Sequence, residues 1–178
     1  MSLNKKEMMA EIVRSGKDPV YFSNKYAQIS HPIRGLIPFD MYRFQEDALK
    51  EFTKNRFNII LKARQLGIST TVASYVCWLM LFHQDKNVMV VATKLGTAAN
   101  LVKKAKAIYK NLPAWLRIAS ITTDNRNSFE LSNGSEVKAS STSGDAGRSE
   151  ALSLLVICCS RGSRRNVGRF IPNPIHRW

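Results

Sequence analysis

Three short, almost wholly apolar runs constrain the fold of this chain more than any other feature. They cover residues 57–61, 87–92 and 152–157. Each has the length and composition of a strand buried on both faces, as in parallel sheets. Segments with helical apolar spacing follow the first two runs, and strands joined by helices favour a doubly wound, mainly parallel α/β sheet.

The remaining segments predict helices and one tight turn around this sheet. Apolar residues recur at helical spacing in most of them, and Asn133-Gly134 between two short strand-like runs (128–131 and 136–139) is typical of a hairpin turn. The other expected elements are helices within 4–28 (interrupted at Asp18-Pro19), over 42–54, 69–83 and 97–111, and an extended loop at 31–38.

The formal net charge is +14, from 27 lysines and arginines against 13 acidic residues. Such an excess favours a polyanionic partner such as nucleic acid, but it also fits a solvated basic surface, and charge alone does not separate the two. The chain has no run long enough to cross a bilayer and no signal-peptide pattern. Three cysteines without a metal-ligand spacing indicate a reduced, intracellular protein.

Residues 62–70, Lys-Ala-Arg-Gln-Leu-Gly-Ile-Ser-Thr, stand between the first apolar run and a long helix. This is the setting of a phosphate-binding loop, G-x-x-x-x-G-K-[ST], whose backbone N–H groups surround phosphate oxygens. Gly67 matches the second glycine, and Ser69 matches the hydroxyl that binds Mg²⁺ through ATP, with Thr70 as the neighbouring alternative.

Two positions of this loop depart from the motif. Lys62 replaces the first glycine, and Ile68 replaces the lysine. A lysine at the front of the loop has a stem long enough to fold back over the phosphates, and Arg64 offers a second cation. Gln65, between Arg64 and Gly67, is a further candidate residue for nucleotide binding. The motif alone favours a basic strand–turn–helix connection that binds nothing. The neighbouring segments of the sequence therefore have to show whether this loop binds phosphate.

Two neighbouring segments carry side chains suited to a nucleotide. In the run Tyr-Arg-Phe-Gln at 42–45, Gln45 can pair with the adenine edge while an aromatic ring stacks on the base. Arg148, just before the third apolar run, can reach a phosphate or contact DNA. A plain amphipathic helix and a solvated loop are the alternative interpretations.

Taken together, these segments resemble the large terminase subunit of tailed bacteriophages. The resemblance covers about residues 20–157 and rests on 38–45, the loop 62–70, Val90-Val91-Ala92-Thr93 and Gly147-Arg148-Ser149 before the third run. Terminase loops often carry their lysine at the front, as Lys62 does here. The resemblance implies a P-loop ATPase that uses ATP and Mg²⁺ to move viral DNA into a procapsid, with a separate nuclease domain.

The resemblance also implies partners and a location. They are double-stranded viral DNA, the portal protein and the small terminase subunit, in the cytoplasm of the infected bacterium and transiently at the procapsid portal, with no membrane partner. The nucleotide ligands that it implies are Gln45, Lys62, Arg64, Gln65, Gly67, Ser69 and Thr70, with Arg148 as an additional cation.

The chain departs from the family after Ile157, the last residue of the third run. Terminase ATPases end this strand in Asp-Glu, which holds Mg²⁺ and orients the attacking water. This chain has Cys158-Cys159 there, and thiols do not replace hard oxygen ligands for Mg²⁺. We therefore expect weak ATP binding and negligible turnover, with Arg64 as the remaining candidate for a catalytic cation.

Residues 158–178 contain five arginines, no acidic residue and no periodicity. Codons compatible with Arg164 onward, when read one base later, permit Glu-Glu-Met-Trp and then Ser-Thr-Gly, which resembles the family's next motif. This suggests that the tail after Ile157 is out of frame, a hypothesis that the gene sequence tests. The expected organisation is a helical and extended lead-in (1–40), a partial P-loop domain (41–157) lacking the later strands, and this tail.

Two other functions remain open from the sequence. A helicase-like DNA translocase shares the glutamine and the loop, although Ile68 at the lysine position argues against it. A non-catalytic basic DNA-binding module fits the charge, although no recognition helix is evident. Nucleotide affinity separates these possibilities, since a pure DNA-binding module has none to lose.

Overall fold

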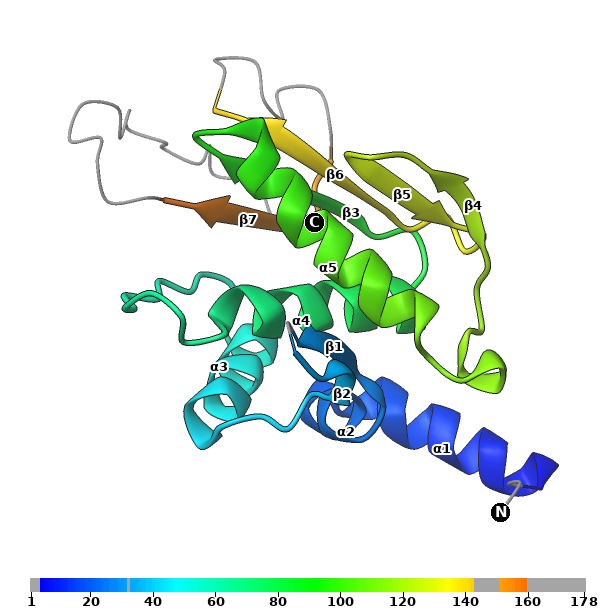
Figure 1. Ribbon diagram of the computed structural model, residues 1–178. Helices are drawn as coiled ribbons and strands as arrows, with labels where there is room; N and C mark the ends of the chain where they lie inside the picture. The colour runs from blue at the N-terminus through cyan, green and yellow to red at the C-terminus, as the bar shows by residue number, and fades with distance from the viewer. Residues whose placement is uncertain (1–3, 32, 143–150, 160–178) are drawn as a thin grey trace.

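The computed structural model describes residues 4–31, 33–142 and 151–159, and shows a helical layer beneath a β-sheet (Figure 1). The helical elements are α1 (Lys5–Lys17), α2 (Pro19–Tyr26), α3 (Arg43–Lys54), α4 (Ile68–Phe82), α5 (Leu95–Lys110) and the short 3₁₀ helix η1 (Ala114–Leu116). The strands are β1 (Gln28–His31), β2 (Gly35–Pro38), β3 (Asn87–Ala92), β4 (Ile121–Asp124), β5 (Ser128–Leu131), β6 (Glu136–Ser141) and β7 (Leu154–Cys158).

The first two helices begin where the sequence predicts. Asn4 caps α1, and its side chain accepts a hydrogen bond from the backbone N–H of Glu7 while the Glu7 carboxylate accepts one in return. Asp18 caps α2, and Pro19 occupies the first turn, where its missing N–H costs nothing. The predicted break between the two helices is therefore confirmed.

The main sheet has five strands in the order β4-β5-β6-β3-β7. Strand β3 lies between β6 and β7 and runs parallel to both, whereas β5 is antiparallel to β4 and to β6. The predicted α/β class is confirmed, with a parallel central part and an antiparallel extension. Gly134 has φ +79°, which the predicted Asn133-Gly134 turn requires.

Helix α5 crosses the sheet, and α4 packs beneath α5 (Figure 1). The core between these layers is continuous from the N-terminal helices to the sheet. It includes Phe22 of α2, Leu49 of α3, Met80 of α4, Val90 of β3 and Phe129 of β5, each at most 1% exposed. In the described part of the chain, no helix is both long and apolar enough to cross a membrane.

The strand predicted over 57–61 is wrong. Residues 55–63 form neither helix nor strand, and the side chains of Ile59 and Leu61 are 99% and 97% exposed. A buried parallel strand needs a hydrogen-bonded neighbour on each side. Within the described ranges, β7 pairs only with β3 and offers its other edge to nothing, so 57–61 has no partner there.

The third apolar run forms a strand, but not the fully buried one that its composition predicts. Strand β7 begins at Leu154, two residues later than expected, and continues one residue past Ile157 to Cys158. Ile157 pairs with Val91 of β3 but is 55% exposed, and the other residues of β7 are half-buried. The expectation of burial on both faces is therefore wrong for Ile157, because β7 is an edge strand of the described sheet.

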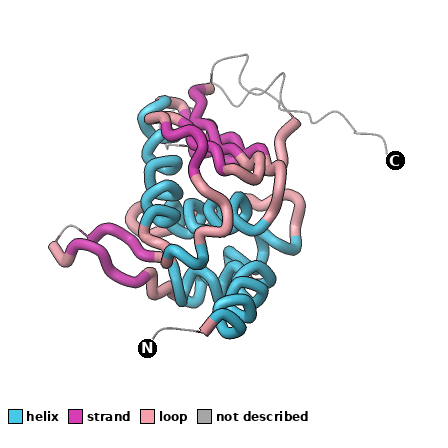
Figure 2. Tube along the Cα trace, turned by 90° about the vertical axis from the view of Figure 1, so that its right-hand side faces the viewer, coloured by secondary structure: helices cyan, strands magenta, loops and turns pink. Residues whose placement is uncertain are grey.

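The segment predicted as an extended loop at 31–38 instead belongs to an antiparallel hairpin of β1 and β2. Figure 2 shows this hairpin standing out from the helical body. Gly35 follows the turn with φ +71°, which makes the reversal possible. The proline pattern correctly indicated extended backbone but not its pairing. Strand β4 was also missed, because four residues carry little periodicity.

Candidate functional site

The loop at 62–67 ends on the first turn of α4. Gly67 is the N-cap of α4 with φ +70°, and Gln65 has φ +64°, so two residues close together adopt the left-handed conformation. The carbonyl of Gly67 accepts hydrogen bonds from the N–H groups of Thr70 and Thr71, which starts the helix. A helix N-terminus carries outward-facing N–H groups and a partial positive charge, which suit phosphate oxygens.

Gln45 of α3 holds this loop in place. Its side chain is 3% exposed, and its Nε2 donates a hydrogen bond to the carbonyl of Leu66 at 3.0 Å, while its Oε1 accepts one from the N–H of Tyr42 at 3.0 Å. A Cβ atom at position 67 would lie 2.5 Å from this Nε2. Gly67 is therefore favoured on two grounds, its own backbone angle and the close approach of the Gln45 side chain, which would have to shift to admit a Cβ atom.

Two aromatic rings lie beside Gln45 in the sequence and are open to solvent. Tyr42 and Phe44 stack at 5.7 Å between centroids with an interplanar angle of 7°, and both side chains are exposed. An exposed stacked pair offers a flat apolar face suited to another ring. The sequence singled out this segment as the place where a base would stack.

The cations predicted for the loop are accessible. Lys62 and Arg64 are exposed, and so is Ser69 at the start of α4. Ile68, which replaces the motif lysine, is 7% exposed and belongs to the interior. The position where other phosphate loops carry their cation is thus used here for packing, and the available positive charge comes from elsewhere.

One positive charge beside the loop, that of Lys104, was not predicted as part of the site from the sequence. Lys104 of α5 donates a hydrogen bond from Nζ to the hydroxyl of Thr70 at 3.2 Å. Its ammonium group therefore lies at the first turn of α4, beside the loop. The sequence indicated only that Lys104 belongs to a basic helix face. The contact depends on the packing of α5 against α4, and no local pattern encodes it.

The carboxyl end of β7, where the family pattern stops after Ile157, lies close to the same loop. Burial raises the pKa of the Cys158 thiol, the adjacent Cys159 raises it further, and the charge of Lys62 opposes both. Lys62 is thus near enough to act on Cys158. Cys77, Cys158 and Cys159 are all free thiols. The Lys62 side chain of the loop is therefore within electrostatic range of Cys158, at the end of the third apolar run.

Mg²⁺ fits this set of donors poorly. Ser69 supplies one hydroxyl oxygen, but the end of β7 supplies thiols, which are soft ligands. In the described ranges 4–31, 33–142 and 151–159, no group of three or more His, Cys, Asp or Glu side chains is arranged to hold a metal ion. The predicted Arg148 and residues 160–178 of the tail lie outside the described residues.

No known protein-family profile matches this chain. Among solved structures, the chain is similar to the large terminase of bacteriophage HK97, with a TM-score of 0.63 and 20% sequence identity. The similarity covers 80% of this chain but 30% of that terminase, so the chain spans less than a third of the protein it matches. At this level of identity the comparison establishes the fold. The described chain has the fold of part of a phage large terminase, as its sequence motifs indicated.

Proposed function

We propose that this chain is the nucleotide-binding part of a DNA-packaging motor of the large-terminase kind. The observation that carries the proposal is the loop at 62–70, fixed by Gln45 at the N-terminus of α4 on a terminase fold. The loop combines backbone N–H groups with exposed cations, which is the chemistry that binds polyphosphate.

The residues then have distinct roles. The backbone from Gln65 to Thr70 surrounds the phosphates, with Gly67 permitting the turn. Lys62 and Arg64 neutralise phosphate charge in place of the motif lysine, and Ser69 would supply a single hydroxyl oxygen to a metal ion that arrives with ATP. Gln45 orients the loop through its hydrogen bond to the Leu66 carbonyl, and the exposed rings of Tyr42 and Phe44 beside it stack on the base. Arg148 is an additional phosphate or DNA ligand.

ATP binding without efficient hydrolysis is the expected behaviour. Hydrolysis needs a carboxylate to orient water and another to hold Mg²⁺, and Cys158 and Cys159 follow Ile157 at the strand end that would supply them. The proposed motor acts on double-stranded viral DNA in the host cytoplasm, with a portal protein and a small subunit as partners. A helicase-like translocase is less favoured because Ile68 is buried.

Equilibrium binding of a fluorescent ATP analogue tests the proposal. We expect Lys62→Ala to weaken binding by about tenfold, roughly 1.4 kcal/mol, because one charged phosphate contact is lost. Lys5→Ala removes a lysine of α1 that is also exposed but lies outside the loop, and it should leave the affinity for the ATP analogue unchanged. A wild-type chain with no measurable nucleotide affinity would make it a basic DNA-binding module instead.

Turnover is measured on the same protein by phosphate release. We expect a turnover rate far below the range of about 1–100 s⁻¹ that is typical of phosphoryl-transfer enzymes. A rate within that range would show that groups other than the end of β7 perform the hydrolysis, and it would contradict the assigned role of this strand end.

A further inference from the structure

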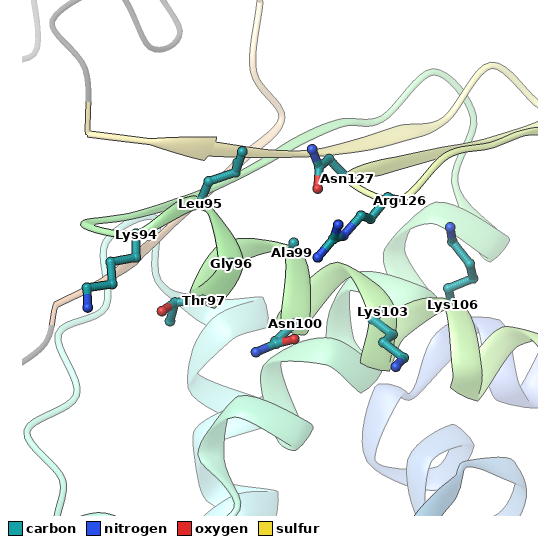
Figure 3. Close-up of a pocket in the computed structure, with 10 residues that line it drawn as sticks. All are labelled: Lys94, Leu95, Gly96, Thr97, Ala99, Asn100, Lys103, Lys106, Arg126 and Asn127. Carbon is teal, nitrogen blue, oxygen red and sulfur yellow. The ribbon is translucent and has the colours of Figure 1, made fainter.

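A basic concavity of about 910 Å³ lies against α5, outside the loop site. It is formed by α5, from its N-cap Lys94 to Lys106, and by the turn between β4 and β5. Figure 3 shows Arg126 reaching from this turn over α5, with Lys103 below it and Lys94 at the N-terminal end of the helix. Lys106, Asn100 and Asn127 complete the polar lining.

The charge of this concavity is positive throughout. Four cations line it, and its described lining contains no aspartate or glutamate. Lys106 is paired with Asp124 at its edge. Lys94, Lys103 and Arg126 are exposed and have no hydrogen-bond or ion-pair partner among the described residues. Like charges held together in a hollow concentrate a positive potential, which an approaching polyanion relieves.

The spacing of the cations favours an extended anion over a single phosphate. Lys94, the N-cap of α5, and Lys103 are nine residues apart, so their backbone positions are separated by about 13 Å along the helix axis. At about 3.4 Å of duplex axis per nucleotide, this distance corresponds to about four nucleotides of one strand. The lining holds few apolar side chains for a small ligand to bury against, but the Asn100 and Asn127 amides can donate to phosphate oxygens.

We propose that this basic concavity holds the phosphate backbone of duplex DNA. The proposal rests on the proposed function, because it names the surface on which a packaging motor would contact its DNA. It also places α5 between two anions, since Lys103 faces the concavity while its neighbour Lys104 contacts the first turn of α4. Contacts to the backbone alone carry no sequence information, which suits a protein that must move along any sequence.

Binding of a fluorescent 30-base-pair duplex to the full chain, measured by anisotropy over a range of salt concentrations, tests this assignment. The site variant carries Lys94→Gln, Lys103→Gln and Arg126→Gln together. The control carries Lys5→Gln, Lys6→Gln and Arg34→Gln, which are exposed and remove the same total charge. Circular dichroism of both variants verifies that the chain remains folded.

The site variant should lose at least about tenfold in affinity, and the slope of log affinity against log salt should become shallower by about 2.7, because three phosphate contacts contribute about 0.9 each. The control should stay within about twofold of wild type. Equal losses in both variants would overturn the assignment, because the binding charge would then be spread over the surface. It would also be overturned if the site variant kept its DNA affinity but lost binding to vesicles containing phosphatidylserine, since the surface would then serve membranes.

Binding of the ATP analogue, measured on the same proteins, tests the nucleotide-binding function independently of DNA binding at the concavity. If the site variant binds DNA normally while the wild type binds ATP, the concavity is wrongly assigned and the proposed function stands. If the wild type binds DNA through the concavity but binds no ATP, the nucleotide function fails and the DNA surface stands.

Discussion

Helix α4 connects two regions that contrast sharply in packing. Its C-terminal half is buried against α2 and α5, where Met80 and Leu81 are at most 1% exposed. Its N-terminal end carries the loop, preceded by a segment in which Ile59 and Leu61 are almost fully exposed. Both regions contain large apolar side chains, but the two regions differ in what surrounds those side chains.

The contrast teaches that an apolar run becomes a buried strand only where it has neighbours. The 87–92 run lies between β6 and β7 and is buried, whereas the 57–61 run pairs with nothing in the described part of the chain. The third run, with β3 on one side, is intermediate, and its Ile157 is more than half exposed. Burial of apolar area contributes about 25 cal/mol per Å², so the packed region supplies stability that the open one does not. The open region instead presents the cations and backbone groups of the candidate site.

The largest effect should come from truncating the same residue type in each region. Leu81→Ala removes a buried side chain and should destabilise the protein by about 2–5 kcal/mol, because it leaves a cavity. Leu61→Ala should change the free energy of unfolding by less than about 0.5 kcal/mol. Denaturant unfolding measures both. A comparable loss for Leu61→Ala would mean that 57–61 is a packed strand after all.

A smaller effect on the free energy of unfolding should distinguish the loop glycine, Gly67, from Gly35, which has no neighbouring atoms where a Cβ would lie. Gly67 and Gly35 have nearly the same φ, +70° and +71°, but only a Cβ atom at 67 would collide with Gln45. Both substitutions by alanine should cost about 1–2 kcal/mol for the left-handed backbone, and Gly67→Ala should cost more.

The additional cost at Gly67 should fall when Gln45→Ala is introduced as well, since the collision disappears. A double-mutant cycle on unfolding free energies measures this coupling. Equal costs at Gly67 and Gly35, or no coupling between Gly67 and Gln45, would show that α3 does not hold the loop.

The smallest effect concerns the acid stability of the packed N-terminal helices α1 and α2. Hydrogen bonds to Glu11 from Tyr26, then from Lys25 and Tyr21, lower the pKa of its carboxyl to about 2. Because the folded-state pKa lies below the ordinary 4.5, this stability is fully present above pH 4.5 and is lost as the pH falls towards 2.

Glu11→Gln should therefore lower the urea midpoint at pH 7 and flatten its dependence on pH between 4.5 and 2. Glu51→Gln on α3, whose ion pair with Lys54 is exposed, is the control and should leave the pH dependence as in wild type. Asp124 also titrates in this window, so the comparison is between variants. An unchanged pH profile for Glu11→Gln would mean that the Glu11 cluster does not hold α1 to α2.

Much of the fold was predictable because it is encoded locally. The break at Asp18-Pro19, helical spacing in α3 and α4, the apolar run of β3 and the Asn133-Gly134 turn each act within a few residues. The strand at 57–61 and the burial of Ile157 were mispredicted, because both depend on a neighbouring strand and not on local composition.

The candidate site divides in the same way. The order of Lys62, Gly67 and Ser69 along the chain was enough to locate the loop. The contacts of Gln45 with Leu66 and of Lys104 with Thr70 join residues 21 and 34 positions apart, and they arise from tertiary packing. The basic concavity likewise joins α5 to the β4–β5 turn, which no sequence motif links.

Hydrogen exchange of backbone amides, with and without saturating ATP, shows whether the loop at 62–70 binds the nucleotide. If 62–70 is a phosphate-binding loop, exchange should slow at the amides from Gln65 to Ser69, and exchange at the Asn133-Gly134 turn should stay the same. Unchanged exchange across this loop, under conditions where ATP is bound, would contradict the account and place the nucleotide elsewhere on the chain.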